Sequence, residues 1–137
     1  MAHQEPATEY VWRGGFENTE VERLHAEAVD HSIIDYGWNG QLERSLGWVT
    51  ARSDNLLVGF VNVAWDGGVH AFILDTMVAI NQRRRGIATQ LIDRARAKAR
   101  EAGCEWLHVD FEDHLEDFYV EACGFRPTKA GLIDLTR

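Results

Sequence analysis

Apolar residues at helical spacing predict three substantial helices. The first has Asn18 as its N-cap and runs to about Val29. The second is the most regular, and Gly103 follows it as a C-cap. Its apolar positions are Ile87, Ala88, Leu91, Ile92, Ala95, Ala99 and Ala102. A third helix is expected at Leu115–Cys123, and a shorter helical stretch near Gly40–Ser45.

Extended patterns fill the intervals between these helices. Strands are predicted at Tyr10–Arg13, Trp48–Ala51, Leu56–Trp65, Ala71–Ala79, Glu105–Phe111 and about Leu132–Leu135. Turn residues at 53–55 and 66–68 join three of these strands into an antiparallel unit. The run AFILDTMVA (71–79) is nearly all apolar, which is typical of a strand buried on both faces.

The order of the elements predicts the fold class. A strand, the long helix and another strand in succession require a crossover connection, so part of the sheet is parallel. We therefore predict a single α/β domain over residues 1–137, with a mixed, partly antiparallel and partly parallel central sheet flanked by helices.

Composition narrows the range of functions. The net charge of −8 argues against a nucleic-acid partner, because such binding depends on a positive surface. No apolar run is long enough for a membrane span, and the first ten residues lack the pattern of a signal peptide, so a cytoplasmic protein is expected. Two cysteines and six scattered histidines give no metal-ligand spacing, so neither a disulfide framework nor a metal is expected.

Three consecutive arginines precede the long helix, in the segment NQRRRGIATQ (81–90). A helix N-terminus attracts anions, and small residues at Gly86 and Ala88 allow a ligand to approach the backbone. Arg83, Arg84 and Arg85 would repel one another unless an anion lay among them. A pyrophosphate is therefore the predicted ligand, and a solvated basic turn is the alternative.

Two motifs together resemble the GNAT N-acetyltransferases. Arg83-Arg84-Arg85-Gly86-Ile87-Ala88 is similar to that family's Q/R-x-x-G-x-G/A segment, which binds the pyrophosphate of acetyl-CoA. Phe118 to Phe125 (FYVEACGF) is similar to its F-Y-x-x-x-G-F pattern. The resemblance covers residues 47–135 well and the first 45 only by element order. It implies the GNAT fold and acetyl-CoA as co-substrate.

The resemblance also implies roles for particular residues. Backbone groups of Thr76, Met77 and Val78 would hold the pantetheine arm, and Thr89 would add a hydroxyl to a phosphate. Tyr119 would protonate the departing thiolate, for which a neutral phenol is suited, and a packed core aromatic beside Phe118 and Phe125 is the alternative. Asp113 stands where many members carry an asparagine that touches the pantetheine.

The general base is left open between several groups. Asp75 is the one carboxylate in the apolar run 71–79, where burial would raise its pKa. His108 and Asp110 share the polar face of the strand at 105–111. A water chain to bulk solvent is the fourth possibility.

The functional prediction is an N-acetyltransferase that acts on a primary amine of a small molecule or peptide by direct transfer in a ternary complex. A non-catalytic acyl-CoA-binding or sensory module is the alternative. Aromatic and acidic residues at 30–43 would suit an ammonium-bearing acceptor, although a solvated loop is the more common explanation for such a mixture. A homodimer is common in the family and is a further possibility.

Overall fold

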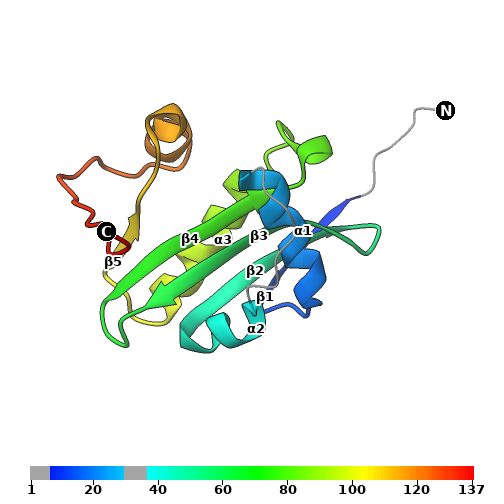
Figure 1. Ribbon diagram of the computed structural model, residues 1–137, viewed down its shortest axis with the longest axis horizontal. Coiled ribbons are helices and arrows are strands. Elements are labelled where there is room, and N and C mark those ends of the chain that lie inside the picture. Colours follow the sequence, from blue (N-terminus) through cyan, green and yellow to red (C-terminus); the bar gives the residue numbers. More distant parts are fainter. Residues whose placement is uncertain (1–6, 30–36) are drawn as a thin grey trace.

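A computed structural model describes residues 7–29 and 37–137 of the protein. Among these residues, five strands form one sheet in the order β1-β2-β3-β4-β5 (Figure 1). The strands are β1 (Thr8–Trp12), β2 (Ser45–Ser53), β3 (Leu56–Trp65), β4 (His70–Val78) and β5 (Trp106–Val109). The helices are α1 (Asn18–Val29), α2 (Trp38–Gln41) and α3 (Ile87–Glu101), with shorter helical turns at 42–44, 80–82, 113–115 and 117–122.

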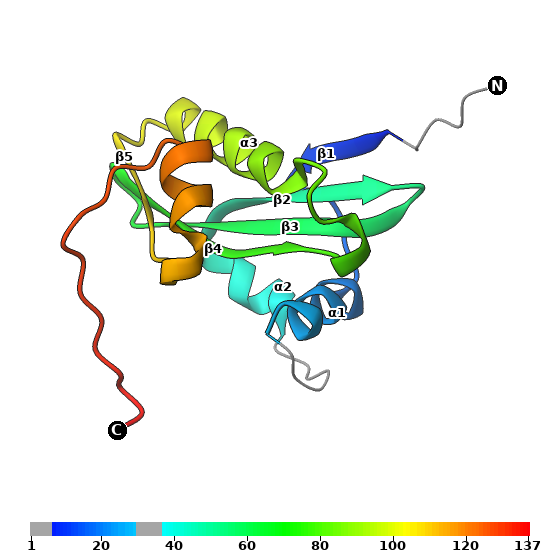
Figure 2. The ribbon, with the colours of Figure 1, turned by 90° about the horizontal axis from the view of Figure 1, so that it is seen from above.

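The sheet is mixed, as the sequence predicted. Strands β1 to β4 pair antiparallel with their neighbours, whereas β4 and β5 are parallel and connected through α3. Figure 2 shows α3 on one face of the sheet and α1 and α2 on the other. The predicted fold class is therefore confirmed.

The core lies in two layers on either side of β2, β3 and β4. Leu91, Ile92 and Ala95 of α3 are completely buried on one side, at the spacing that predicted this helix. Trp38 fills the other side, where its ring packs edge-on against Phe60 at a centroid distance of 6.1 Å.

The helix predicted to start after Asn18 begins at that residue instead. The Glu17 backbone N–H donates to Glu20 Oε1 at 2.9 Å, so Glu20 closes the first turn in the manner of a capping box. The Asn18 side chain accepts a hydrogen bond from the Trp38 backbone N–H at 2.7 Å, which fixes α2 against α1.

Strand β4 contains one extra residue. Opposite Phe60 and Asn62 of β3, the partners on β4 are Met77 and Leu74, so three steps on β4 face two on β3. Asp75 within this bulge has a φ of 56°, a left-handed conformation that Asp tolerates better than most residues. Pairing with β5 ends at Ile73, immediately before the bulge. Strand β4 therefore separates from β5 at this point.

Two expectations about exposure and pairing are wrong. Strand β4 is not buried on both faces, because Phe72 and Leu74 are 38% and 45% exposed. The last predicted strand, Leu132–Leu135, does not form, and the chain after Phe125 belongs to no helix or strand and has a turn at 135–136. Both errors concern the edge of the sheet next to β5, where no helix within residues 7–29 and 37–137 covers the face on which Phe72 and Leu74 lie.

Arg52 fixes the start of α1 to the β2–β3 hairpin. Its guanidinium donates to both Glu20 oxygens at 2.8 and 2.9 Å and to the carbonyls of Asn55 and Gly15 at 2.8 and 3.0 Å. This hydrogen-bonded ion pair lowers the pKa of Glu20 below its usual range. The pair therefore stabilises the fold when Glu20 is ionised.

We expect Glu20→Gln to lower the free energy of unfolding at neutral pH by about 1 kcal/mol, because the partly exposed pair is screened by solvent. The pKa of Glu20 is lower in the folded protein than in the unfolded chain. The stabilisation is therefore fully present above the pKa of the unfolded state, and it is lost as the pH falls through the pKa of the folded state. Denaturant unfolding at several pH values should show the variant and the wild type converging in acid. Exposed Glu9→Gln is the control, and an equal loss at every pH would contradict the assignment.

Candidate active site

A groove of about 590 Å³ lies between the end of β4, the start of α3 and the helical turns at 113–122. Three separate segments that the sequence singled out meet in it. The predicted residues that line it are Thr76, Met77, Val78, Arg83, Arg84, Gly86, Ile87, Ala88, Thr89 and Tyr119. The two sequence motifs therefore face one shared groove, although 29 residues separate them along the chain.

The backbone at the entrance to α3 is shaped for close approach. Gly86 has a φ of 79°, and nothing lies within 4 Å of the place that a Cβ would occupy. Ile87 begins α3, so the N–H groups of its first turn have no partner within the helix. Together with the positive end of the helix dipole, these groups favour an anion at this end of the groove.

The three arginines differ in where their side chains lie. Arg83 and Arg84 line the groove, and the Arg83 Nε donates to the Val78 carbonyl at 3.4 Å. Arg84 has a φ of 66°, so the chain turns sharply here. Arg85 does not line the groove, and its guanidinium donates to the Gln82 side chain. The repulsion among three adjacent cations is relieved in part by this divergence.

Asp113, expected at the pantetheine, does not line the groove. It begins a helical turn at Asp113–Leu115 and is exposed, whereas its neighbours His114 and Leu115 are among the lining residues.

Tyr119 forms the inner wall of the groove. Its ring is 7% exposed and is surrounded by three aromatic rings, those of Phe111, Phe118 and Phe125, at centroid distances of 5.2, 4.8 and 5.9 Å. Burial raises the pKa of the Tyr119 phenol, and the nearby Thr76 side chain opposes this rise only in part. The hydroxyl therefore stays protonated at neutral pH.

Thr76 is the residue that connects Tyr119 to the β4 bulge. Its hydroxyl is buried and lies beside the Tyr119 hydroxyl, whose pKa it lowers. The hydroxyls of Thr76 and Tyr119 therefore lie together in the lining of the groove.

Asp75 lies on the other side of β4, facing α2. Gln41 Nε2 donates to its Oδ2 at 3.4 Å. Burial raises the pKa of Asp75, while the Asn62 side chain and the positive potential of His25 oppose the rise. Asn62 is itself buried and held by a hydrogen bond from Ser45 Oγ at 2.5 Å. Asp75 is therefore a half-buried carboxylate, held by two amides, one residue away from the groove-lining Thr76.

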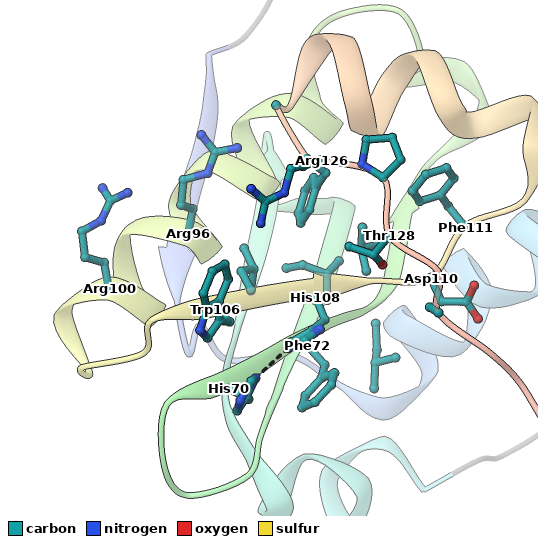
Figure 3. Close-up of a pocket in the computed structure, with 18 residues that line it drawn as sticks. His70, Phe72, Arg96, Arg100, Trp106, His108, Asp110, Phe111, Arg126 and Thr128 are labelled. Carbon is teal, nitrogen blue, oxygen red and sulfur yellow. Dashed lines mark hydrogen bonds between the residues drawn. The ribbon is translucent and has the colours of Figure 1, made fainter.

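His108 and Asp110 belong to a second groove of about 1010 Å³ around β5 (Figure 3). His108 Nε2 and His70 Nδ1 are hydrogen-bonded at 2.7 Å, and the His108 ring stacks on Phe72 at 4.7 Å. Both His108 and Asp110 are exposed. The structure therefore separates these two candidates for a general base from Asp75, which faces α2.

The sequence of residues 9–125 matches the Acetyltransferase (GNAT) family. This match spans most of the chain. The protein belongs to the GNAT acetyltransferase family. None of the curated proteins matches its sequence, so solved structures provide the comparison.

Several solved structures share the GNAT fold of this chain. A probable acetyltransferase from meticillin-resistant Staphylococcus aureus is 16% identical with a TM-score of 0.79, over 94% of this chain and 98% of the other. The ribosomal-protein-alanine N-acetyltransferase of Brucella melitensis biovar Abortus is 23% identical with a TM-score of 0.75, over 94% and 99%. AAC(6')-Iy, in complex with a CoA-based bisubstrate analogue, is 19% identical with a TM-score of 0.75, over 96% and 99%.

Two polar residues that hold Asp75 in this GNAT domain, Gln41 and Asn62, were not predicted from the sequence. They come from separate elements, and neither stands in a motif. Of the aromatic and acidic residues noted at 30–43, Asp30, Asp35 and Tyr36 lie outside the described residues. Trp38 is buried and its indole donates to Glu22 Oε2 at 3.0 Å, so it belongs to the core rather than to an exposed wall.

Two further findings concern residues 7–29 and 37–137 only. No helix there has the length and apolarity to cross a bilayer. No group of three or more potential ligand side chains in these ranges is placed to hold a metal ion.

We expect Asp75→Asn to raise the thermal stability of the GNAT domain at neutral pH. The pKa of Asp75 is higher in the folded protein than in the unfolded chain. Its favourable contribution to the free energy of unfolding is therefore present below the pKa of the unfolded state, and it is lost as the pH rises through the pKa of the folded state. The neutral amide avoids the cost of burying a charge, and Asn tolerates the φ of 56°.

Thermal unfolding and an NMR titration of the carboxyl carbon, both from acidic to neutral pH, measure this effect. Exposed Asp110→Asn is the matched control. A carboxyl of Asp75 that titrates at or below the ordinary value for Asp would contradict the assignment.

Proposed function

We propose that this acetyltransferase moves an acetyl group from acetyl-CoA to a primary amine of a small molecule or peptide, by direct transfer in a ternary complex. One observation carries the proposal. Residues of the bulged strand, the arginine segment and the turn that holds Tyr119 converge on one groove of about 590 Å³.

The residues present fit acetyl-CoA. The open space at Gly86 and the N–H groups that begin α3 suit a pyrophosphate, and Arg83 and Arg84 supply positive charge beside them. Thr76, Met77 and Val78 follow the bulge, where β4 has separated from β5, and so present backbone groups to a pantetheine arm. When bound, acetyl-CoA supplies the activated acetyl group as a thioester.

Two side chains suit the proton transfers, namely Tyr119 in the groove and Asp75 on the other side of β4. Tyr119 keeps its proton at neutral pH and can deliver it to the sulfur as the carbon–sulfur bond breaks. Asp75 has a raised pKa and so takes up a proton from an incoming ammonium more readily than an ordinary carboxylate would. We assign Asp75 rather than His108 or Asp110 as the base, because it adjoins Thr76 in the same strand, whereas the other two are exposed in the second groove.

The first test measures acetyl-CoA binding by calorimetric titration. We expect the double variant Arg83→Ala/Arg84→Ala to weaken the Kd at least about tenfold, because charge-assisted hydrogen bonds to the pyrophosphate are lost. Arg85→Ala, which removes the arginine outside the groove, should bind like the wild type. An equal loss in both variants would point to general electrostatics, and no binding by the folded wild type would overturn the proposal.

The second test separates catalysis from binding. We expect Tyr119→Phe to lower kcat about 100-fold or more, through loss of the proton donor, and to leave the Kd for acetyl-CoA unchanged. Turnover of a panel of small-molecule and peptide amines supplies the assay, and thermal unfolding checks that the variant is folded. A wild type that binds acetyl-CoA and acetylates none of the panel would instead favour an acyl-CoA-binding module.

A further inference from the structure

The turn that carries Tyr119 has a wide, π-helical backbone. It spans Asp117–Ala122, and the Cys123 backbone N–H that follows it donates to the Phe118 carbonyl, five residues back, at 3.0 Å. Single π-helical turns are frequent at functional sites. In the segment 117–125, Tyr119 and Cys123 are the buried residues. The position of the Tyr119 hydroxyl therefore depends on what holds this segment.

The aromatic contacts of Tyr119 fix its ring only in part. Phe118 and Phe125 belong to the same segment and move with it. Phe111, which follows β5, is stacked on the ring with an interplanar angle of 24° and a centroid distance of 5.2 Å. A stacked pair keeps the spacing of its two rings, but it allows them to slide past each other. A contact that holds the segment itself would fix the lateral position of the ring.

Arg96 of α3 supplies such a contact. Its guanidinium donates from Nη2 to the Cys123 carbonyl oxygen, across 27 residues of sequence. Carbonyls at the end of a helical turn have no partner within the helix, and a hydrogen bond from a charged donor is roughly twice as strong as one between neutral groups. Burial raises the pKa of the Cys123 thiol, and the nearby positive charge of Arg96 opposes the rise. The guanidinium therefore lies against the buried end of the segment.

Helix α3 connects this contact to the rest of the site. The first turn of α3 lines the groove proposed for acetyl-CoA, and Leu91, Ile92 and Ala95 anchor the helix in the core. Arg96 follows Ala95 and is half-buried, and it lines the second groove instead of the first (Figure 3). It can therefore locate Tyr119 relative to the co-substrate without touching the co-substrate.

We propose that Arg96 is a positioning residue for Tyr119. By holding the Cys123 carbonyl it fixes the end of the π-helical turn, and so keeps the Tyr119 hydroxyl beside Thr76 in the groove. This inference rests on the proposed role of Tyr119 as the proton donor. A displacement of about 1 Å in a reacting group can lower a rate about 100-fold, so a contact remote from the reacting atoms can determine kcat.

Kinetics of Arg96 variants test the proposal. We expect Arg96→Met to lower kcat about tenfold or more and to leave the Kd for acetyl-CoA unchanged, because the donor to Cys123 is lost while the groove stays intact. Arg96→Lys keeps a cationic donor and should recover part of the rate. Arg100→Met is the matched control and should act like the wild type, because Arg100 is exposed one turn further along α3. A wild-type kcat in Arg96→Met, or an equal loss in Arg100→Met, would overturn the proposal.

A double-mutant cycle separates positioning from a general structural role. In the Tyr119→Phe background, Arg96→Met should lower kcat no further, because no hydroxyl is left to position. Thermal unfolding checks that each variant is folded. Losses that multiply in the double variant would mean that Arg96 acts independently of Tyr119, which contradicts the assignment.

The NMR signal of the Tyr119 ring gives a readout that needs no turnover. The chain has three tyrosines, so Tyr119→Phe identifies this signal in protein made with isotope-labelled tyrosine. We expect Arg96→Met to shift or broaden the signal and Arg100→Met to leave it unchanged. If Arg96→Met does not fold, Arg96→Gln, whose shorter side chain loses the contact, provides the same comparison. An unchanged signal would overturn the proposal. A wild type that acetylates no amine would overturn the proposed function instead, and the ring signal would still decide whether Arg96 positions Tyr119.

Discussion

The single extra residue in β4 is the constraint on which the site depends. Strand β4 lies between two neighbours and would ordinarily pair with both along its length. The bulge at Asp75 shifts the register against β3, immediately after pairing with β5 has ended at Ile73. The following residues are thereby turned toward the groove, with Asp75 on one side of the strand and Thr76 on the other. The left-handed backbone of Asp75 is the local cost of this geometry.

The same burial sets the protonation of both candidate catalytic groups. Desolvation disfavours the charged form of any group, so it raises the pKa of the Asp75 carboxyl and of the Tyr119 phenol alike. For Tyr119 the result is a phenol that keeps its proton at neutral pH. For Asp75 the result is a carboxylate with a greater affinity for a proton than an ordinary one. Burial therefore determines which of the two candidate groups carries a proton to give and which can accept one.

The sequence predicted most helices and strands well, but it predicted poorly which side chains are exposed at the β5 edge of the sheet. Helix α3 follows from periodicity, because its buried positions recur every three or four residues whatever they pack against. Most of the cofactor-binding residues that the motifs predicted line the groove, whereas Arg85 and Asp113 do not. A motif fixes neighbours in sequence, whereas the divergence of Arg83 and Arg85 depends on backbone dihedrals that no residue type dictates. Gln41 and Asn62 were missed because their role exists only once three elements have packed.

The two errors of exposure have one explanation. An apolar run such as 71–79 predicts burial, but it does not specify what covers each face of the strand. Phe72 and Leu74 beside the β5 edge, and Leu132–Leu135 in the C-terminal tail, are apolar patterns that no other described part of the chain covers. Periodicity therefore predicts which positions of an element are apolar, and the packing of the other elements decides whether those positions are covered.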